Sequence, residues 1–159
     1  MLSDLSASAR RVQEVLQEHG LDCQVVELPD STRTAPEAAA AIGCQVAQIV
    51  KSLVFRGRHT DRPILVIASG ANRVNEKRLG ELAGEPVEKA SADFVRERTG
   101  FAIGGVPPLG HAEPLLTFID QDLLRYDIVW AAAGTPHAVF RLTPSQLIRV
   151  AGGKVTPIT

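Results

Sequence analysis

Apolar residues near the start of the chain recur at alternating spacings of three and four, which is the period of a helix with one buried face. Polar and charged residues fill the positions between them. The spacing predicts an amphipathic helix that ends at Gly20, followed by a strand over residues 21–28. The apolar face of this helix comprises Leu2, Leu5, Ala9, Val12, Leu16 and His19.

Further helices are predicted where a capping residue precedes an apolar pattern. Thr34 and Glu37 match a capping box, and the helix that they begin is interrupted at Gly43, with a short helical turn at 46–50 after it. Thr143 followed by Pro144 is typical of a helix start. The other two predicted helices run from the caps Asn75 and Ser91 to Gly84 and Gly100.

Short apolar and β-branched runs predict strands between these helices. The run 63–69 is apolar almost throughout, which favours a central strand. The order mixes hairpin-like strand pairs with helices and lacks the regular alternation of a doubly wound sheet. We therefore expect an α+β fold, a mixed, curled sheet or barrel-like core with surrounding helices, and residues 1–159 as one domain. Strands are expected at 50–55, 63–69, 87–89, 115–119, 128–132 and 138–142, with an edge strand at Val150 and Val155.

Composition narrows the class of protein. Apolar residues make up 45% and charged residues 22% of the 159 residues, and the formal net charge is −1. This charge argues against a protein that coats nucleic acid, DNA included, but leaves contact through a few local cations open. Cys23 and Cys44 lack metal or disulfide spacing and are expected to be buried thiols. We find no signal-peptide pattern and no apolar run of membrane-spanning length, so we expect a cytoplasmic protein with no membrane partner.

Lys51 is unusual because it lies inside a predicted strand. Side chains alternate between the two faces of a strand, so Lys51 shares a face with Leu53 and Phe55. Considered alone, it is most simply a lysine at the end of a strand whose ammonium reaches water. The functional alternative is a cation at the edge of a pocket that binds phosphate or a substrate carbonyl.

Two glycine-containing segments are the other candidates. Residues 104–110 hold three glycines and two prolines, and such a loop either forms a tight turn or presents main-chain amides to an oxyanion. In residues 131–137, small residues precede Gly134 and leave room for a ligand. His137 is there a general base, a hydrogen-bonding group or an ordinary turn histidine. His111 and Glu113 lack the spacing of metal ligands, so no metal site is expected.

Four blocks in this order resemble the YbaK/ProX family of aminoacyl-tRNA deacylases, which also occurs as the editing insertion of bacterial prolyl-tRNA synthetases. The resemblance extends over nearly the whole chain. "IVKSLVF" followed by "GGVPPLG" is specific in combination, although neither block is specific alone. The blocks are residues 32–37 (TRTAPE), 48–55 (QIVKSLVF), 100–110 (GFAIGGVPPLG) and 132–137 (AAGTPH).

The resemblance implies a barrel-like core with a pocket for the 3′ end of a charged tRNA. Lys51 matches the lysine of the family that holds the terminal nucleotide or the acyl linkage. Residues 104–108 match its GxxxP loop, whose amides bind the ester carbonyl, and Gly134 matches a glycine on the opposite pocket wall. The implied reaction is ester hydrolysis by a positioned water, with no metal or cofactor. The implied catalytic residues are Lys51, Gly104 and Gly105, and the implied substrate-binding residues are Thr32, Ser52, Val106, Pro108, Gly134 and His137.

The last block departs from the branch of the family that removes cysteine. That branch carries a "SAG…GLD" pattern, whereas this chain has Ala132 and Ala133 before Gly134, and Val139 at the position of the aspartate. The form with Pro136 and His137 is closer to branches that edit alanine or similarly small amino acids. This closeness makes His137 a candidate for the pocket wall.

The resemblance thus predicts a trans-editing hydrolase for tRNA, with tRNA(Pro) carrying a small non-cognate amino acid such as alanine or cysteine as its substrate. Expected partners are the aminoacyl-tRNA 3′ end and prolyl-tRNA synthetase. One alternative is a module that binds aminoacyl-tRNA, a nucleotide or a synthetase without catalysis. Another is a hydrolase of a different small ester or amide. Arg73, Lys77 and Arg78 form a basic cluster, either solvated or in contact with the acceptor stem.

Overall fold

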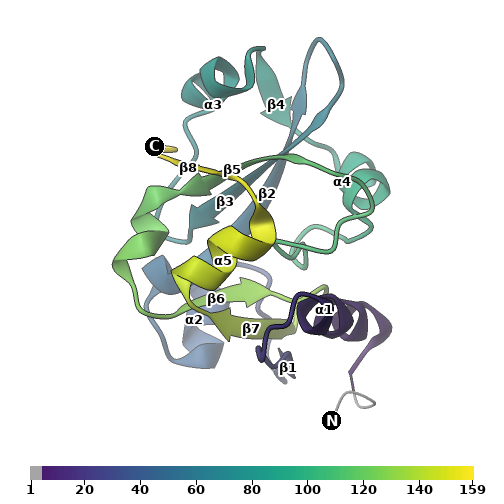
Figure 1. Ribbon diagram of the computed structural model, residues 1–159, viewed down its shortest axis with the longest axis vertical. Helices are drawn as coiled ribbons and strands as arrows, with labels where there is room; N and C mark the ends of the chain where they lie inside the picture. Colours follow the sequence, from purple (N-terminus) through teal and green to yellow (C-terminus); the bar gives the residue numbers. More distant parts are fainter. Residues whose placement is uncertain (1–4) are drawn as a thin grey trace.

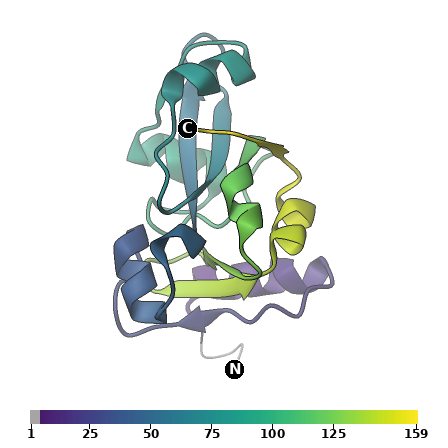
Figure 2. The same cartoon turned by 90° about the vertical axis from the view of Figure 1, so that its left-hand side faces the viewer.

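A computed structural model describes residues 5–159 and shows a curled mixed sheet with helices packed around it (Figures 1 and 2). The helices are α1 (Ala7–Glu18), α2 (Ala35–Ile42), α3 (Glu76–Ala83), α4 (Ala92–Thr99) and α5 (Pro144–Ala151), with 3₁₀ turns η2 (Val46–Gln48) and η3 (Gln121–Arg125). The strands are β1 (Val26–Glu27), β2 (Ile49–Gly57), β3 (Pro63–Ser69), β4 (Val87–Lys89), β5 (Leu116–Asp120), β6 (Val129–Ala132), β7 (Ala138–Leu142) and β8 (Lys154–Thr156).

Capping side chains fix where the helices begin, as the sequence predicts. The hydroxyls of Thr34, Ser91 and Thr143 and the amide oxygen of Asn75 each accept a hydrogen bond from a main-chain N–H of the first turn. The first helix is capped by Ser6, and Leu2, which the periodicity assigns to it, lies outside the described residues. Helices α2 to α5 each end at a glycine in the left-handed conformation: Gly43, Gly84, Gly100 and Gly152.

The strand predicted over 21–28 is wrong for most of its length. Only Val26 and Glu27 pair with a neighbouring strand, which is β7. The side-chain amide of the buried Gln13 serves the main chain before them, donating to the Cys23 carbonyl at 3.0 Å and accepting from the Val25 amide at 2.8 Å. Buried and exposed residues do alternate over 21–25, but the Gln13 side chain takes the main-chain hydrogen bonds that a neighbouring strand would otherwise make. The predicted edge strand is also corrected, because Val150 lies in α5 and only Val155 lies in a strand, β8.

The sheet has the order β1-β7-β6-β2-β3-β5-β8, with β4 paired to β2 beside this path. The pairs β2–β6, β3–β5 and β5–β8 are parallel and the others are antiparallel. This arrangement confirms the predicted mixed, curled sheet with outer helices. Figure 1 shows α5 crossing the strands, α1 beside β7, and α3 at the opposite end of the molecule.

The two faces of the sheet pack into different apolar clusters. Val50 and Val54 of β2 belong with α1, α4 and α5, whereas Leu53 and Phe55 pack with β3 and α3. This division confirms the alternation predicted around Lys51. A third cluster joins α2 to Ile49 at the start of β2. Within residues 5–159, no helix is long and apolar enough to cross a membrane.

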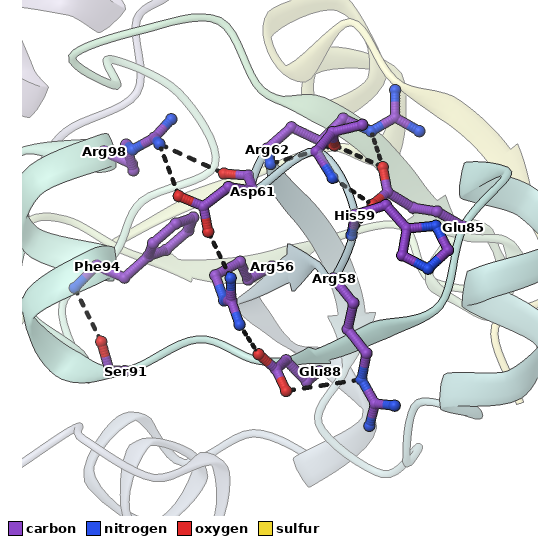
Figure 3. A network of polar contacts seen from close by, with 11 residues as sticks. Arg56, Arg58, His59, Asp61, Arg62, Glu85, Glu88, Ser91, Phe94 and Arg98 are labelled. Carbon is purple, nitrogen blue, oxygen red and sulfur yellow. Dashed lines mark hydrogen bonds and ion pairs between the residues drawn. The ribbon is translucent and has the colours of Figure 1, made fainter.

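A polar network closes the far end of the β2–β3 hairpin (Figure 3). The Glu85 carboxylate accepts hydrogen bonds from the main-chain amides of His59 and Thr60 and from the Thr60 hydroxyl, the last at 2.6 Å. It also pairs with Arg62 at 3.1 Å. These interactions lower the pKa of Glu85 to about 2, and the hydrogen bonds from Thr60 are the largest cause.

The same network holds α4 against the hairpin. Arg98 pairs with Asp61 at 3.6 Å and with Glu113 at 3.0 Å, and its guanidinium lies 4.9 Å from the centre of the Phe94 ring. Arg56 pairs with both Asp61 and Glu88. Because α4 leads directly into the glycine-rich loop, this anchoring sets where that loop begins.

Candidate functional site

The sheet is split along one edge of β2, and the split opens into a cavity. Val50 pairs with β6 and Phe55 pairs with β4. The Val54 carbonyl still accepts from the Ala90 amide at 3.3 Å, and residues 51–53 have no main-chain partner on that edge among the described residues. The cavity at this place has a volume of about 950 Å³. Its walls come from β2, α2, the 70–76 segment, the glycine-rich loop and β6.

Lys51 lies at the edge of this cavity, half-buried. Its Nζ donates to the main-chain carbonyl of Asn72 at 2.8 Å. Burial lowers the pKa of the Lys51 ammonium, the positive charge of Arg73 lowers it further, and Asp120 acts in the opposite direction. The ammonium is therefore held by a neutral acceptor, which leaves its charge available to an anionic ligand.

The charged residues around the cavity are mostly positive. Arg33, Lys51, Arg73 and Lys89 line it, and Glu76 is the one acidic residue among the lining residues. This surplus occurs on a chain whose formal net charge is −1. Sequence reasoning missed the contributions of Arg33 and Lys89, because only the fold brings residues so far apart in the chain to one rim.

The glycine-rich loop contributes two residues to the lining of the cavity. Gly104 and Val106 both line it, and within residues 5–159 neither amide has a hydrogen-bond acceptor. The Gly105 amide instead donates to the Ala102 carbonyl at 3.0 Å. The amide of Gly105, predicted as a catalytic residue, is thus engaged in a turn and is not free to bind an oxyanion, which leaves the amides of Gly104 and Val106 as the candidate donors.

Gly105 has a structural reason to be glycine. A Cβ atom there would lie 2.8 Å from the main-chain carbon of Gly134 and 2.9 Å from Cα of Thr135. Gly134 itself donates its amide to the Gly105 carbonyl at 2.8 Å and adopts φ of +94°, which other residues rarely take. The two glycines therefore lock the loop onto the β6–β7 turn. This contact lies behind the cavity wall, outside the lining residues.

Thr32 and Ser52 both line the cavity and share an unusual property. The Oγ1 atom of Thr32 and the Oγ atom of Ser52 are buried without a hydrogen-bond partner in the described part of the chain. Buried hydroxyls are nearly always paired, because an unpaired one costs about 1–3 kcal/mol. Less than 1 Å² of either oxygen is accessible, so both lie just beneath the surface of the cavity.

Two other predicted binding residues lie away from the cavity. His137 is exposed, and its Nδ1 lies 3.1 Å from the Asp30 carbonyl, where it joins the β6–β7 turn to the segment before α2. Pro108 is buried, and its neighbour Pro107 gives its carbonyl to His111 Nε2 at 2.7 Å. Burial lowers the pKa of His111, so this histidine holds the loop as a neutral donor. The predicted places of His137 and Pro108 in the pocket wall are therefore not supported by their positions.

The described residues contain no group of three or more His, Cys, Asp or Glu side chains that could hold a metal ion. Cys23 and Cys44 are free thiols, the former buried and the latter half-buried. The polar groups of the lining residues thus include one ammonium, two main-chain amides and two hydroxyls without partners, and a mostly positive rim. Such a set suits an anionic ligand with a polarised carbonyl.

The fold and the cavity define an aminoacyl-tRNA editing protein. The model of the aminoacyl-tRNA editing domain family matches residues 29–150, which is most of the chain. The chain belongs to this family, as the four sequence blocks indicate. It is an aminoacyl-tRNA deacylase, a hydrolase that edits mischarged tRNA by cleaving the ester between the amino acid and the ribose.

Individual relatives agree with this assignment. The chain is 52% identical to a solved structure described as a proposed trans-editing enzyme for prolyl-tRNA synthetase, with a TM-score of 0.92 over 98% of this chain and 99% of that one. The protein YwhH of Bacillus subtilis (strain 168) is 35% identical over 131 residues, which are 82% of this chain and 83% of YwhH.

Two further relatives carry named substrates or partners. A protein of Enterococcus faecalis, named as a proposed Cys-tRNA(Pro)/Cys-tRNA(Cys) deacylase, is 24% identical over 127 residues, which are 79% of this chain and 77% of that protein. The proline–tRNA ligase of Thermosipho melanesiensis is 33% identical over 98 residues, which are 61% of this chain but only 17% of the ligase.

Proposed function

We propose that this deacylase acts in trans on tRNA(Pro) that carries a small non-cognate amino acid, such as alanine or cysteine, and that the aminoacyl 3′ end binds in the cavity at the split of β2. The observation that carries this proposal is the convergence, in one cavity, of the Lys51 ammonium, two free main-chain amides and two unpaired hydroxyls. The positive rim fits the phosphates of an RNA 3′ end.

The reaction is hydrolysis of the aminoacyl ester. A water oxygen forms a bond to the carbonyl carbon, and negative charge develops on the carbonyl oxygen. The amides of Gly104 and Val106 stabilise that charge, as main-chain donors do in other acyl-transfer enzymes. The bond from carbon to the ribose oxygen then breaks, and that oxygen takes a proton from the attacking water, through solvent or substrate groups, and becomes the ribose hydroxyl. The products are free amino acid and uncharged tRNA.

Lys51 binds and orients the substrate in this mechanism. Its ammonium is fixed by the Asn72 carbonyl at one side of the cavity, and the glycine-rich loop contributes to the same cavity. An anionic phosphate or the polarised ester held by Lys51 is thereby placed near the two amides. Such positioning converts the attack of water into a reaction between neighbours, which is a large source of rate enhancement.

Several small apolar residues line part of the cavity. Ala35, Ala38, Ala131 and Ala132 line the cavity together with valines. Apolar pockets separate amino acids that differ by one methylene only about 10–200-fold. Alanine side chains widen a cavity rather than narrow it, so these walls alone give no basis for rejecting the prolyl ester, and the choice of amino acid rests on the hydrolysis assay.

The similarity to proline–tRNA ligases and to the proposed trans-editing enzyme supports tRNA(Pro) as substrate and prolyl-tRNA synthetase as a partner. The tRNA substrate supports a cytoplasmic location. The similarity to the proposed Cys-tRNA(Pro)/Cys-tRNA(Cys) deacylase keeps cysteine among the candidate amino acids.

The test is to incubate the purified protein with tRNA(Pro) charged separately with alanine, cysteine, serine or proline, and to follow loss of the ester. We expect one non-cognate ester to be hydrolysed at least about tenfold faster than the prolyl ester, the kind of ratio a shape-based pocket achieves. Equal rates on all four esters, or rates equal to those in buffer, would refute the proposed substrate.

A further inference from the structure

Asp120 is a buried carboxylate that takes no direct part in the cavity. It ends β5, is 1% exposed, and caps η3 by accepting the Asp122 amide at 2.9 Å. Its other oxygen accepts from the Ser69 amide at 3.0 Å and from Nδ2 of Asn72 at 2.8 Å. No ion pair reaches it from the described residues. Burial of an unpaired charge is costly unless hydrogen bonds replace water, and three donors do so here.

Asn72 connects this carboxylate to Lys51. Its Nδ2 donates to Asp120 and also to Asp122, both at 2.8 Å. Its main-chain carbonyl accepts the hydrogen bond from Lys51 Nζ, and its amide closes a turn onto the Ser69 carbonyl at 2.9 Å. The side chain of Asn72 is thus anchored on two acids while its main chain faces the lysine.

We infer that Asp120, acting through Asn72, positions the Lys51 ammonium at the cavity and stabilises its charge. Asp120 is then a positioning residue for the deacylation. This inference rests on the proposed function of Lys51, but it concerns residues outside all four sequence blocks, and Asp120 is not among the residues that line the cavity. Its sequence signal is weak, because an acid at a strand end before a short turn is most simply a helix cap.

Geometry makes the charge of Asp120 difficult to replace. Both oxygens of Asp120 accept hydrogen bonds, from three donors in total. An asparagine of the same shape offers only one acceptor oxygen, so its NH₂ group would face a donor. The variant Asp120→Asn therefore breaks part of the network without changing its volume.

The charges that act on Lys51 give the inference a direct readout. Arg73 disfavours the protonated lysine and Asp120 favours it, while burial also disfavours it. Asp122, the other acid that accepts from Asn72, is not among the charges that shift the pKa of Lys51. Loss of the negative charge at Asp120 leaves Arg73 and burial unopposed, and the pKa of Lys51 then falls.

The experiment follows the titration of Lys51 by NMR on protein with ¹³C-labelled lysine side chains, in wild type, Asp120→Asn and Asp127→Asn. Asp127 is an exposed acid of the same region and serves as the matched control. We expect the midpoint for Lys51 to move to lower pH in Asp120→Asn and to stay in Asp127→Asn. The same midpoint in all three proteins would overturn the inference.

Deacylation assays complete the test. We expect Asp120→Asn and Asn72→Ala to lower kcat/KM about 10-fold or more, the scale of a misplaced substrate-binding group, and the falling limb of the pH–rate profile to move to lower pH in Asp120→Asn. If the wild type is active and both variants keep its kcat/KM, the inference about Asp120 is wrong and the proposed function stands. If the wild type hydrolyses no ester but the Lys51 midpoint still moves in Asp120→Asn, the proposed function is wrong and the link from Asp120 to Lys51 stands. If Asp120→Asn fails to fold, Asn72→Ala at its half-buried position carries the activity test.

Discussion

At the scale of single residues, neighbouring residues of the same type have different roles. Gly104 contributes an amide to the cavity, whereas Gly105 packs its main chain against the main chain of Gly134. Thr32 and Ser52 are buried hydroxyls that gain nothing from the protein itself. These differences are invisible in the sequence and each can be tested by one substitution.

Replacing Gly105 by alanine places a Cβ against main-chain atoms that cannot rotate away. The glycine-rich loop must shift, and a displacement of about 1 Å in a reacting group costs about 10²-fold in rate. We expect Gly105→Ala to lose about that factor in kcat/KM. The control is Gly43→Ala, where a Cβ meets open space but φ is +85°. That variant should lose about 1 kcal/mol of stability and keep its deacylation rate.

Removing the unpaired hydroxyls should separate stability from activity. Thr32→Val and Ser52→Ala delete buried polar atoms that have no partner, so the free energy of unfolding should stay unchanged or rise by about 1 kcal/mol. The same variants should raise KM if a ligand satisfies those hydroxyls. Thermal unfolding and deacylation kinetics measure both effects. A clear loss of stability without a change in KM would show that the hydroxyls are structural.

At the scale of elements, the hairpin network ties α3, α4 and β4 to the loop at 58–62 (Figure 3). Glu85 is its centre and shows the lowered pKa of a carboxylate that is charged in the folded state. Its folded pKa lies below its unfolded value. Its stabilising contribution is therefore complete above the unfolded pKa of about 4.3 and disappears as the pH falls through about 2.

The variant Glu85→Gln tests this network through the pH dependence of the free energy of unfolding. We expect it to be less stable than wild type at pH 7, because the amide replaces an anion that accepts four interactions. The difference should shrink as the pH falls from about 4.3 towards about 2, where the wild-type carboxylate gains its proton. Urea unfolding at a series of pH values measures it. A difference that is independent of pH would show that charge is not the cause.

Most of the helices and strands can be predicted from the sequence, because the residues that begin and end them act locally. Capping residues such as Thr34 and Ser91 act within three residues of themselves. The strand predicted at 21–28 fails because Gln13, on another element, takes over its hydrogen bonds. The hydrophobic pattern cannot show that a side chain, rather than a neighbouring strand, bonds the main chain.

The site is predictable only in part, for the same reason. Lys51, Gly104, Thr32 and Ser52 meet in one cavity, as the family resemblance implies. The positive rim and the link from Asp120 to Lys51 depend on contacts between residues about 50 positions apart, such as that of Asn72 with Asp120. No local pattern encodes such a contact.

At the scale of the whole molecule, charge is distributed unevenly. The chain is slightly acidic overall, yet four cations and one acid line the cavity. This concentration of cations around one cavity fits a short anionic ligand. The single-stranded 3′ end of a tRNA has that length.

Salt dependence measures this footprint. If all four cations contact phosphates, the slope of log K against log salt for uncharged tRNA(Pro) should be about −3. Arg73→Ala and Lys89→Ala should each reduce the slope by about 1. Arg141→Ala is the control, since Arg141 lies on β7 and lines a different groove. A slope that Arg73→Ala and Lys89→Ala leave unchanged would place the RNA elsewhere on the molecule.

The most direct test of the central claim is to locate the bound aminoacyl 3′ end. An adenosine that carries alanine through an amide at its 3′ position resists hydrolysis and can be titrated into ¹⁵N-labelled protein. The account predicts amide shifts at Lys51, Ser52, Gly104 and Val106, and none in the hairpin loop 58–62. Shifts confined to the groove beside Cys23 and Arg141 would contradict it, because the cavity at the split of β2 would then not be the binding site.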